Sequence, residues 1–366
     1  MRLADIPTPA LVLDRRVLLR NIAAMHRAVS RHGVALRPHM KTAKSIDVAR
    51  LALGATSTGI AVSTLAEAEY FLGHDLPDMI YTVGITPQKL DQVGKLNAAG
   101  AAIMVVTDDV GCAAAIAAHP TAPRTLIEID TGEGRGGVAA DDPQLEELAA
   151  RLGPLLAGVM THGGHSYAGR GAADMARIAE AERSGVAAAA ARLTAAGHPM
   201  RIVSMGSSPT ALHTASLAGV TELRAGVYMF GDLFQAEIGT HGDSDLALTV
   251  LASVIGRKPG SVLLDAGAIA LSKDRSTAAT TRDRGYGLML DLAGQRSYGT
   301  AILLQAWQEH SLVELDPDAH APQLAVGARV RIAPNHACLT AAAHDRYFVV
   351  EDGDAVVAVW PRVGGW

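Results

Sequence analysis

Aromatic residues and cysteines are scarce in this sequence. Phe, Trp and Tyr make up 4% of the 366 residues, whereas hydrophobic residues of all kinds make up 49%. A core with so few rings must be built from Ala, Val, Leu and Ile, which suits helices packed around parallel strands. Only two cysteines occur, Cys112 and Cys338. They argue against a disulfide-stapled secreted fold, and we expect a reducing, cytoplasmic location.

The sequence also lacks an excess of basic charge, a long apolar run and a signal peptide. Its formal net charge is −5, which argues against nucleic acid as a partner. No apolar run is long enough to span a bilayer, so no membrane partner is expected. Residues 1–7 contain no apolar core of the kind found in signal peptides. These absences favour a cytoplasmic protein that acts on a small molecule.

Strand-like and helix-like segments alternate over the first part of the chain. Apolar, strand-like runs cover 59–63, 79–83, 102–106, 125–129, 157–160 and 201–205, and helix-like segments cover 64–73, 87–99, 109–118, 142–152 and 172–196. This alternation is typical of parallel βαβ units, and the number of units is enough to close a (β/α)8 barrel. A doubly wound open sheet is the alternative.

The pattern changes beyond residue 236. Strand-like runs, separated by Gly and Asp turns without a long intervening helix, cover 246–255, 261–265, 329–332 and 347–350. We therefore predict an α/β fold with two domains. A (β/α)8 TIM-type barrel would span 15–235, and a mainly β domain would span 236–366 together with the N-terminal strand segment 1–14.

A basic cluster follows the second strand of the predicted barrel. Arg37, His39, Lys41 and Lys44 lie within eight residues, just before a helix-like stretch. Chemistry in such barrels takes place at the carboxyl ends of the strands. Neighbouring positive charges favour the neutral amine that Schiff-base chemistry needs. Lys41 is therefore the candidate catalytic lysine, and a solvated basic turn is the alternative for this segment alone.

Two further strand ends carry small and polar residues. The segment 160–167 contains His162, His165 and Tyr167, next to two glycines that allow a ligand to approach closely. In the segment 205–210, small residues would expose backbone N–H groups and hydroxyls that suit a phosphate. Each segment, taken alone, also fits an ordinary loop rich in Gly and Ser.

His336 and Cys338 stand two residues apart, directly after an apolar run. On an extended segment their side chains would point to the same side. One imidazole and one thiolate suit zinc. A His-x-Cys pair by itself is weak evidence, and a pair without any metal role is the alternative.

Together these segments resemble the D-serine dehydratase and D-threonine aldolase family. The motifs occur in order along the whole chain: Arg37-Pro38-His39-x-Lys41-Thr42-x-Lys44, Glu128-x-Asp130-x-Gly132-x-x-Arg135-x-Gly137, His162-x-Gly164-His165-x-Tyr167, Gly206-Ser207-x-Pro209-Thr210, Arg224-x-Gly226-x-Tyr228 and Pro334-Asn335-His336-x-Cys338. The resemblance implies a fold type III pyridoxal-phosphate (PLP) enzyme. It also implies an alanine-racemase-like barrel, a β domain that carries a metal site, and a homodimer.

The resemblance implies roles for individual residues. Lys41 would carry PLP covalently and act as the base that removes the α-proton. The other cofactor contacts would come from Arg135, Tyr167, Gly206, Ser207, Ser208, Thr210 and Tyr228. His336 and Cys338 would bind a divalent metal that holds the substrate's 3-hydroxyl. Zinc is the expected metal, with manganese or another divalent ion as alternatives.

The expected activity is that of a lyase acting on a D-3-hydroxy amino acid: D-serine, D-threonine or 3-hydroxy-D-aspartate. β-Elimination would give a 2-oxo acid and ammonia. Cys338 favours this dehydratase reaction, because aldolase-type members more often have a carboxylate at that position. The alternatives are retro-aldol cleavage to glycine and an aldehyde, with His165 as the base, and an amino-acid racemase. A non-catalytic PLP-binding protein is a further alternative, and the β domain counts against it.

Overall fold

The computed structural model describes residues 1–54, 57, 59–315, 324–351 and 353–366. The chain falls into two compact units. One, the β unit, comprises residues 1–23 and 227–362, and the other, the barrel unit, comprises 24–226 and 363–366. The domain boundaries predicted above stay predictions, because a division by contacts does not test which segments fold alone. No helix in the described ranges is long and apolar enough to cross a membrane.

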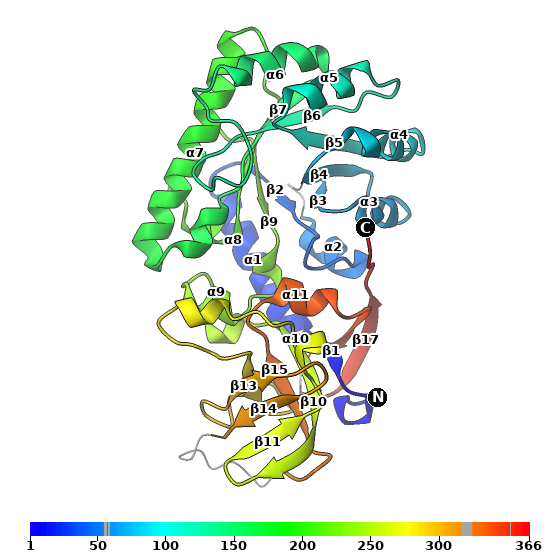
Figure 1. Ribbon diagram of the computed structural model, residues 1–366, viewed down its shortest axis with the longest axis vertical. Coiled ribbons are helices and arrows are strands. Elements are labelled where there is room, and N and C mark those ends of the chain that lie inside the picture. Colours follow the sequence, from blue (N-terminus) through cyan, green and yellow to red (C-terminus); the bar gives the residue numbers. More distant parts are fainter. Residues whose placement is uncertain (55–56, 58, 316–323, 352) are drawn as a thin grey trace. The chain divides into compact units, whose positions relative to one another are not determined.

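The barrel unit is built on a parallel sheet (Figure 1). Its eight strands within the described ranges are, in sheet order, β2 (Ala35–Pro38), β9 (Glu222–Ala225), β8 (Ile202–Met205), β7 (Leu156–Met160), β6 (Thr125–Glu128), β5 (Ala102–Thr107), β4 (Asp78–Gly84) and β3 (Ile60–Val62). A parallel bridge between His39 and Ala61 joins the two outer strands just beyond β2. The sheet thereby closes into a near-barrel, which confirms the predicted TIM-type fold over the open sheet.

Helices follow the strands as expected for βα units. Those with bounds in this part of the chain are α1 (Arg15–Ser30), α2 (Ile46–Ala52), α3 (Leu65–Leu72), α4 (Leu90–Ala98), α5 (Val110–Ala118), α6 (Gln144–Leu152), α7 (Gly171–Ala195) and α8 (Ser208–His213). Side-chain caps fix where several of them begin. Thr64 accepts the Glu67 N–H at the start of α3, and Asp109 accepts the Cys112 N–H at the start of α5.

The β unit is built on a second sheet, which is mainly antiparallel. Its nine strands in the described part of the chain are, in order, β11 (Ser261–Leu264), β14 (Ser311–Glu314), β13 (Ile302–Ala306), β12 (Leu288–Leu290), β15 (Arg329–Ala333), β10 (Leu248–Lys258), β1 (Ala10–Asp14), β16 (Arg346–Val350) and β17 (Val356–Pro361). Because β11 also pairs with β10, the strands from β10 to β15 close into a small barrel. The predicted β domain is confirmed, although the sequence pattern did not predict β12, β13, β14 and β17.

A buried ion-pair cluster lies at the amino-terminal side of the parallel strands. Arg37 on β2 is 2% exposed, and its Nε donates to both carboxylate oxygens of Glu222 at 3.0 and 3.1 Å. Its Nη1 donates to Asp78 at 2.8 Å. Both carboxylates stand at the first residue of their strands, β9 and β4. Arg37 is thus neutralised here, and it does not add the uncompensated positive charge beside Lys41 that the basic cluster predicts.

Replacement of Glu222 by glutamine should destabilise the protein strongly. The Glu222→Gln change leaves a buried guanidinium with half of its countercharge, and loss of one partner of a buried pair typically costs about 3 kcal/mol or more. The matched control is Glu147→Gln, which breaks the exposed pair between Glu147 and Arg151 and should cost less than about 1 kcal/mol. Urea unfolding measures both. Equal losses of unfolding free energy in the two variants would show that the buried pair stabilises the protein no more than the exposed pair does.

Candidate functional site

Lys41 lies in a tight turn directly after β2. The Lys44 N–H donates to the Met40 carbonyl at 2.8 Å, and Lys44 has a left-handed φ of 45°. The Lys44 ammonium lies 3.2 Å from the buried Glu67 carboxylate, so Lys44 is not the uncompensated neighbour predicted from the sequence. The Lys41 side chain itself is exposed at the carboxyl end of its strand. The turn therefore places its amine where a ligand can reach it.

His39 is held beside Lys41 as a neutral ring. The Lys41 N–H donates to Nδ1 of His39 at 3.2 Å, so the ring proton belongs on Nε2, which donates to Thr82 Oγ1 at 2.9 Å. Thr82 in turn donates to the Val62 carbonyl at 3.1 Å. Burial, then the positive charges of Lys41 and Arg224, lowers the pKa of His39 well below its ordinary value. His39 is therefore an uncharged neighbour of the lysine.

His162, after β7, is a second neutral histidine. Its Nδ1–H donates to the Gly206 carbonyl at 2.9 Å. Burial lowers the pKa of His162 to about 3, and the charges of Arg135, Arg224 and Lys41 act in the same direction. Because Nδ1 is the donor, Nε2 keeps its lone pair. The charge of Lys41 thus acts on both histidines, and both belong to its immediate surroundings.

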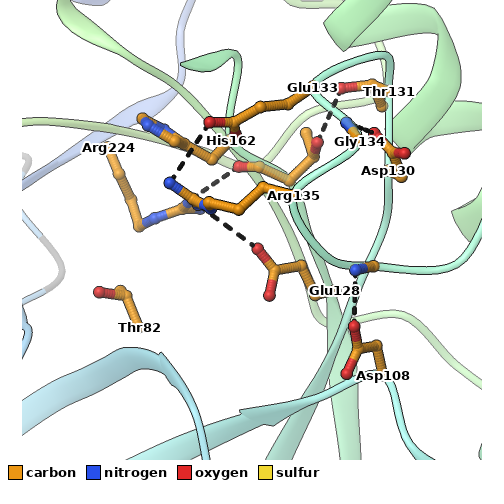
Figure 2. A network of polar contacts seen from close by, with 12 residues as sticks. Thr82, Asp108, Glu128, Asp130, Thr131, Glu133, Gly134, Arg135, His162 and Arg224 are labelled. Carbon is orange, nitrogen blue, oxygen red and sulfur yellow. Dashed lines mark hydrogen bonds and ion pairs between the residues drawn. The ribbon is translucent and has the colours of Figure 1, made fainter. Parts of the chain in front are cut away.

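Arg135 belongs to a polar network over the carboxyl end of β6 (Figure 2). It pairs with Glu133 at 3.4 Å and with Glu128 at 3.8 Å, and its side chain is 59% exposed. Burial raises the pKa of the Glu128 carboxyl, against the effect of Arg135 and Arg224. Arg224 on β9 is buried and donates to the Thr161 carbonyl at 2.7 Å. These contacts hold two cations, Arg135 and Arg224, near the carboxyl ends of the strands.

The loop that carries Arg135 is fixed by two carboxylates (Figure 2). Asp130 accepts the N–H groups of Gly132 at 2.9 Å and Gly134 at 3.1 Å. Asp108 accepts the Gly137 N–H at 2.6 Å. Gly137 has a φ of +95°, and a Cβ there would come within 2.6 Å of the Asp130 nitrogen. Glycine is therefore required where the loop closes, and the closed loop sets the direction of Arg135.

The loop from β8 to α8 brings Gly206, Ser207, Ser208 and Thr210 together. Ser207 and Thr210 exchange hydrogen bonds: each hydroxyl accepts the other's backbone N–H, at 3.1 and 3.2 Å. The Gly206 N–H donates to the buried Glu182 carboxylate at 2.8 Å. Three backbone N–H groups that the sequence predicts to be open to a phosphate are therefore already used. A phosphate at this loop would depend on hydroxyls more than on these amides.

His165 and Tyr167 lie on the 3-10 helix η4 (Gly164–Ala168), and both are half-buried. His165 Nδ1 is buried and has no hydrogen-bond partner among the residues that the structure describes. A bound ligand would satisfy this atom. Tyr228, the remaining predicted phosphate contact, belongs to the β unit, on η5 (Val227–Met229). Burial raises the pKa of its phenol well above the ordinary value.

The barrel unit fits PLP by the chemistry of its donors. PLP is a pyridine ring with a phenolic oxygen and a phosphate, and it attaches through an amine. The exposed Lys41 supplies the amine, and Arg135 and Arg224 supply positive charge. The hydroxyls after β8 and the unsatisfied His165 nitrogen supply polar contacts. Of these, the sequence-based prediction did not assign a role to Arg224.

His336 and Cys338 lie at the start of α11 (Ala337–Ala342), in the β unit. His336 is the N-cap and Cys338 lies in the first turn, so the extended segment predicted for this pair is wrong. Burial disfavours the charged ring, but hydrogen bonds to Asp274 and Cys338 raise the pKa of His336 to about 10. The two side chains thus contact each other, and a neighbouring imidazole and thiol fit a divalent metal.

Two carboxylates, Asp232 and Asp274, support the predicted metal-ligand pair, and the sequence analysis did not predict either of them. Asp232 accepts the Ala337 N–H at 2.9 Å and so fixes the start of α11. Asp274 accepts from His336 Nδ1 at 3.1 Å. No group of three or more His, Cys, Asp or Glu side chains in the described ranges is arranged to hold a metal ion. Asp232 and Asp274 lie far from α11 in the sequence, so no spacing pattern could link them to it.

Two protein families match the chain in succession. The family "Alanine racemase, N-terminal domain" matches residues 13–233. The family "Putative serine dehydratase domain" matches residues 247–350. The first covers the strands and loops of the barrel unit, and the second covers most of the β unit.

Relatives match over nearly their full lengths. D-threo-3-hydroxyaspartate dehydratase from Delftia sp. (strain HT23) is 42% identical over 100% of this chain and 99% of its own, and its solved structure has a TM-score of 0.95. D-threonine aldolase from Arthrobacter sp. is 34% identical over 98% of this chain and 92% of its own. D-serine dehydratase from Dictyostelium discoideum is 26% identical over 96% and 95%. The chain therefore belongs to the D-serine dehydratase and D-threonine aldolase family of PLP-dependent lyases, with an alanine-racemase-like barrel.

Proposed function

We propose that this protein is a PLP- and divalent-metal-dependent dehydratase of D-3-hydroxy amino acids. The observation that carries the proposal is the exposed Lys41 amine at the carboxyl end of β2, beside the neutral His39. The similarity to a D-threo-3-hydroxyaspartate dehydratase over the full chain supports 3-hydroxy-D-aspartate as the first substrate to test. D-Serine and D-threonine are the other candidates.

Lys41 would hold the cofactor and then act as a base. PLP supplies an electron sink for the α-carbon of an amino acid. Once the substrate amine replaces it, the freed Lys41 amine would take the α-proton from one face. His39 and His162 are both neutral, so neither adds positive charge around Lys41, and His162 keeps Nε2 as a hydrogen-bond acceptor. Arg135 would lie at the cofactor's phenolic oxygen.

Tyr167 would lie against the pyridine nitrogen, and the hydroxyls of Ser207, Ser208 and Thr210 would hold the phosphate, together with Gly206 and Tyr228. A neutral phenol at that position would leave the ring nitrogen without a proton. The ring then accepts less negative charge, which favours a reaction in which the charge leaves with a substituent of the substrate. β-Elimination is such a reaction, whereas racemisation needs the charge to be held until a proton returns.

His336 and Cys338 would hold the metal. A divalent ion supplies the Lewis acid that makes a 3-hydroxyl a better leaving group. One imidazole and one thiolate suit zinc, with manganese or another divalent ion as the alternative. A cysteine-to-alanine mutant of a D-threo-3-hydroxyaspartate dehydratase was solved in a metal-free form, and a histidine-to-alanine mutant has also been solved. Metal identity, the homodimer and the cytoplasmic location all stay predictions for this chain.

Retro-aldol cleavage is the second candidate reaction. The similarity to D-threonine aldolase supports it. His165, with its unsatisfied Nδ1, is the candidate base for the 3-hydroxyl. Cys338 favours the dehydratase, because aldolase-type members of the family more often have a carboxylate at that position. The products separate the two reactions directly.

The PLP-loaded protein, incubated with D-threo-3-hydroxyaspartate, D-serine or D-threonine, should release 2-oxo acid and ammonia in equal amounts. Lys41→Ala should lower the turnover rate by about 10³-fold or more, because both the attachment point and the α-proton base are lost. Lys95→Ala, at an exposed position on α4, is the matched control and should leave turnover unchanged. Glycine and an aldehyde as the main products would contradict the dehydratase.

Chelation should stop turnover and leave the cofactor absorbance intact, because the predicted metal ligands and the cofactor lysine belong to different units. Cys338→Ala should act like chelation, since one remaining ligand holds the ion too weakly. Cys112→Ala removes the chain's other cysteine, which is buried on α5, and should keep both metal and turnover. Elemental analysis measures the metal content of each preparation, and the assay measures its turnover. Full activity in a metal-free preparation would remove the metal from the mechanism.

A further inference from the structure

Asp274 contacts the proposed metal ligand His336 through one defined atom pair. Nδ1 of His336 lies 3.1 Å from Oδ2 of Asp274. The exposed fraction of the side chain is 17% for Asp274 and 39% for His336. Because the carboxylate can only accept, the ring must carry its proton on Nδ1 when it is neutral. Nε2 then carries the lone pair that a metal requires.

The Asp274 carboxylate is itself held in place. Its Oδ1 accepts the Ser276 N–H at 2.8 Å and also the Ser276 hydroxyl. The Asp274 N–H donates to the Ser272 hydroxyl at 3.2 Å. With Oδ1 used by Ser276, Oδ2 is the oxygen directed at His336. The aspartate is therefore fixed before any metal binds.

Asn335 joins the aspartate's loop to the residue just before the ligand. Its Nδ2 donates to the Asp274 carbonyl at 3.0 Å and to the Gly285 carbonyl at 2.6 Å. Its Oδ1 accepts from the Thr277 hydroxyl at 3.2 Å. The buried amide is thus satisfied on both sides. The loop with Asp274 and the turn with His336 cannot move apart without breaking these bonds.

We propose that Asp274 is a positioning residue of the metal centre, which orients the His336 ring and fixes its tautomer so that Nε2 faces the metal. The proposal rests on the metal site of the proposed function. Carboxylates that accept from a histidine ligand in this way typically raise metal affinity about 10- to 100-fold, by ordering the ring and making it a stronger donor. Asp274 would not touch the metal.

The test measures metal affinity, with Zn²⁺ and Co²⁺ alone as probes, by competition with a chromophoric chelator at a fixed pH. Asp274→Ala should weaken Zn²⁺ binding about 10- to 100-fold. Asp274→Asn should weaken it less, because the amide oxygen still accepts from Nδ1 without the charge. Asp291→Ala is the matched control: Asp291 also accepts a backbone N–H and a serine hydroxyl in a turn of the same unit. The Asp291→Ala variant should bind Zn²⁺ as tightly as the unmodified protein does.

At saturating Co²⁺, the thiolate-to-cobalt absorption should persist in both Asp274 variants and vanish in Cys338→Ala, since Asp274 acts on the ring alone. Circular dichroism checks folding, and Asp274→Asn carries the test if Asp274→Ala does not fold. One outcome would overturn this inference and leave the metal site standing. In it, the unmodified protein binds Zn²⁺, His336→Ala does not bind it, and both Asp274 variants bind it normally. If His336→Ala binds Zn²⁺ as tightly as the unmodified protein, the metal site is wrong and the inference falls with it.

Discussion

Eight parallel strands can present their carboxyl ends to one ligand only if the sheet closes, and within the described ranges a backbone junction between the end of β2 and β3 closes it. His39 and Ala61 form that junction through a parallel bridge, and the Met40 N–H donates to the Ala61 carbonyl at 2.8 Å. The same turn carries Lys41 two residues later. The His39 side chain then extends to Thr82 on β4. The same backbone turn therefore closes the barrel and places Lys41 at its carboxyl end.

Charge pairing around this turn separates Lys41 from the other cations. Arg37 is neutralised by Glu222 and Asp78 on the amino-terminal side of the barrel, and Lys44 is paired with Glu67. Among the residues that the structure describes, no carboxylate forms an ion pair with the Lys41 amine. The neutral His39 accepts the Lys41 backbone N–H, and the charge of Lys41 acts on His162. The Lys41 side chain is exposed, whereas its neighbours Arg37 and Lys44 are held in ion pairs.

The sequence predicts the architecture well because the period of the barrel is regular. Apolar runs such as 102–106 and 125–129 coincide with β5 and β6, and the Gly-rich motifs follow strand ends where site residues are predicted. It fails where structure depends on contacts between distant segments. Nothing near Lys44 in the sequence reveals that Glu67 neutralises it, and the short strands β12 to β14 follow from pairing with β11 and β15 more than from their own pattern.

The residue types of the candidate site could be predicted from the sequence, but the local structure and the protonation of its residues could not. The family resemblance, and not the His-x-Cys spacing alone, predicts His336 and Cys338 as a metal pair. The two residues lie at a helix start instead of the predicted extended segment, and Asp232 accepts the Ala337 N–H there. The neutral state of His162 depends on burial and on three cations from separate segments. Asp274 and Glu182 reach their partners across 62 and 24 positions. Such distances leave no local signal.

The central claim is that Lys41 is the residue that holds the cofactor. Borohydride reduction of the PLP-loaded protein, followed by proteolysis and mass spectrometry, tests it most directly. The account predicts one pyridoxyl group per chain, on Lys41. A pyridoxyl group on Lys44 or on any other lysine, with Lys41 unmodified, would contradict it.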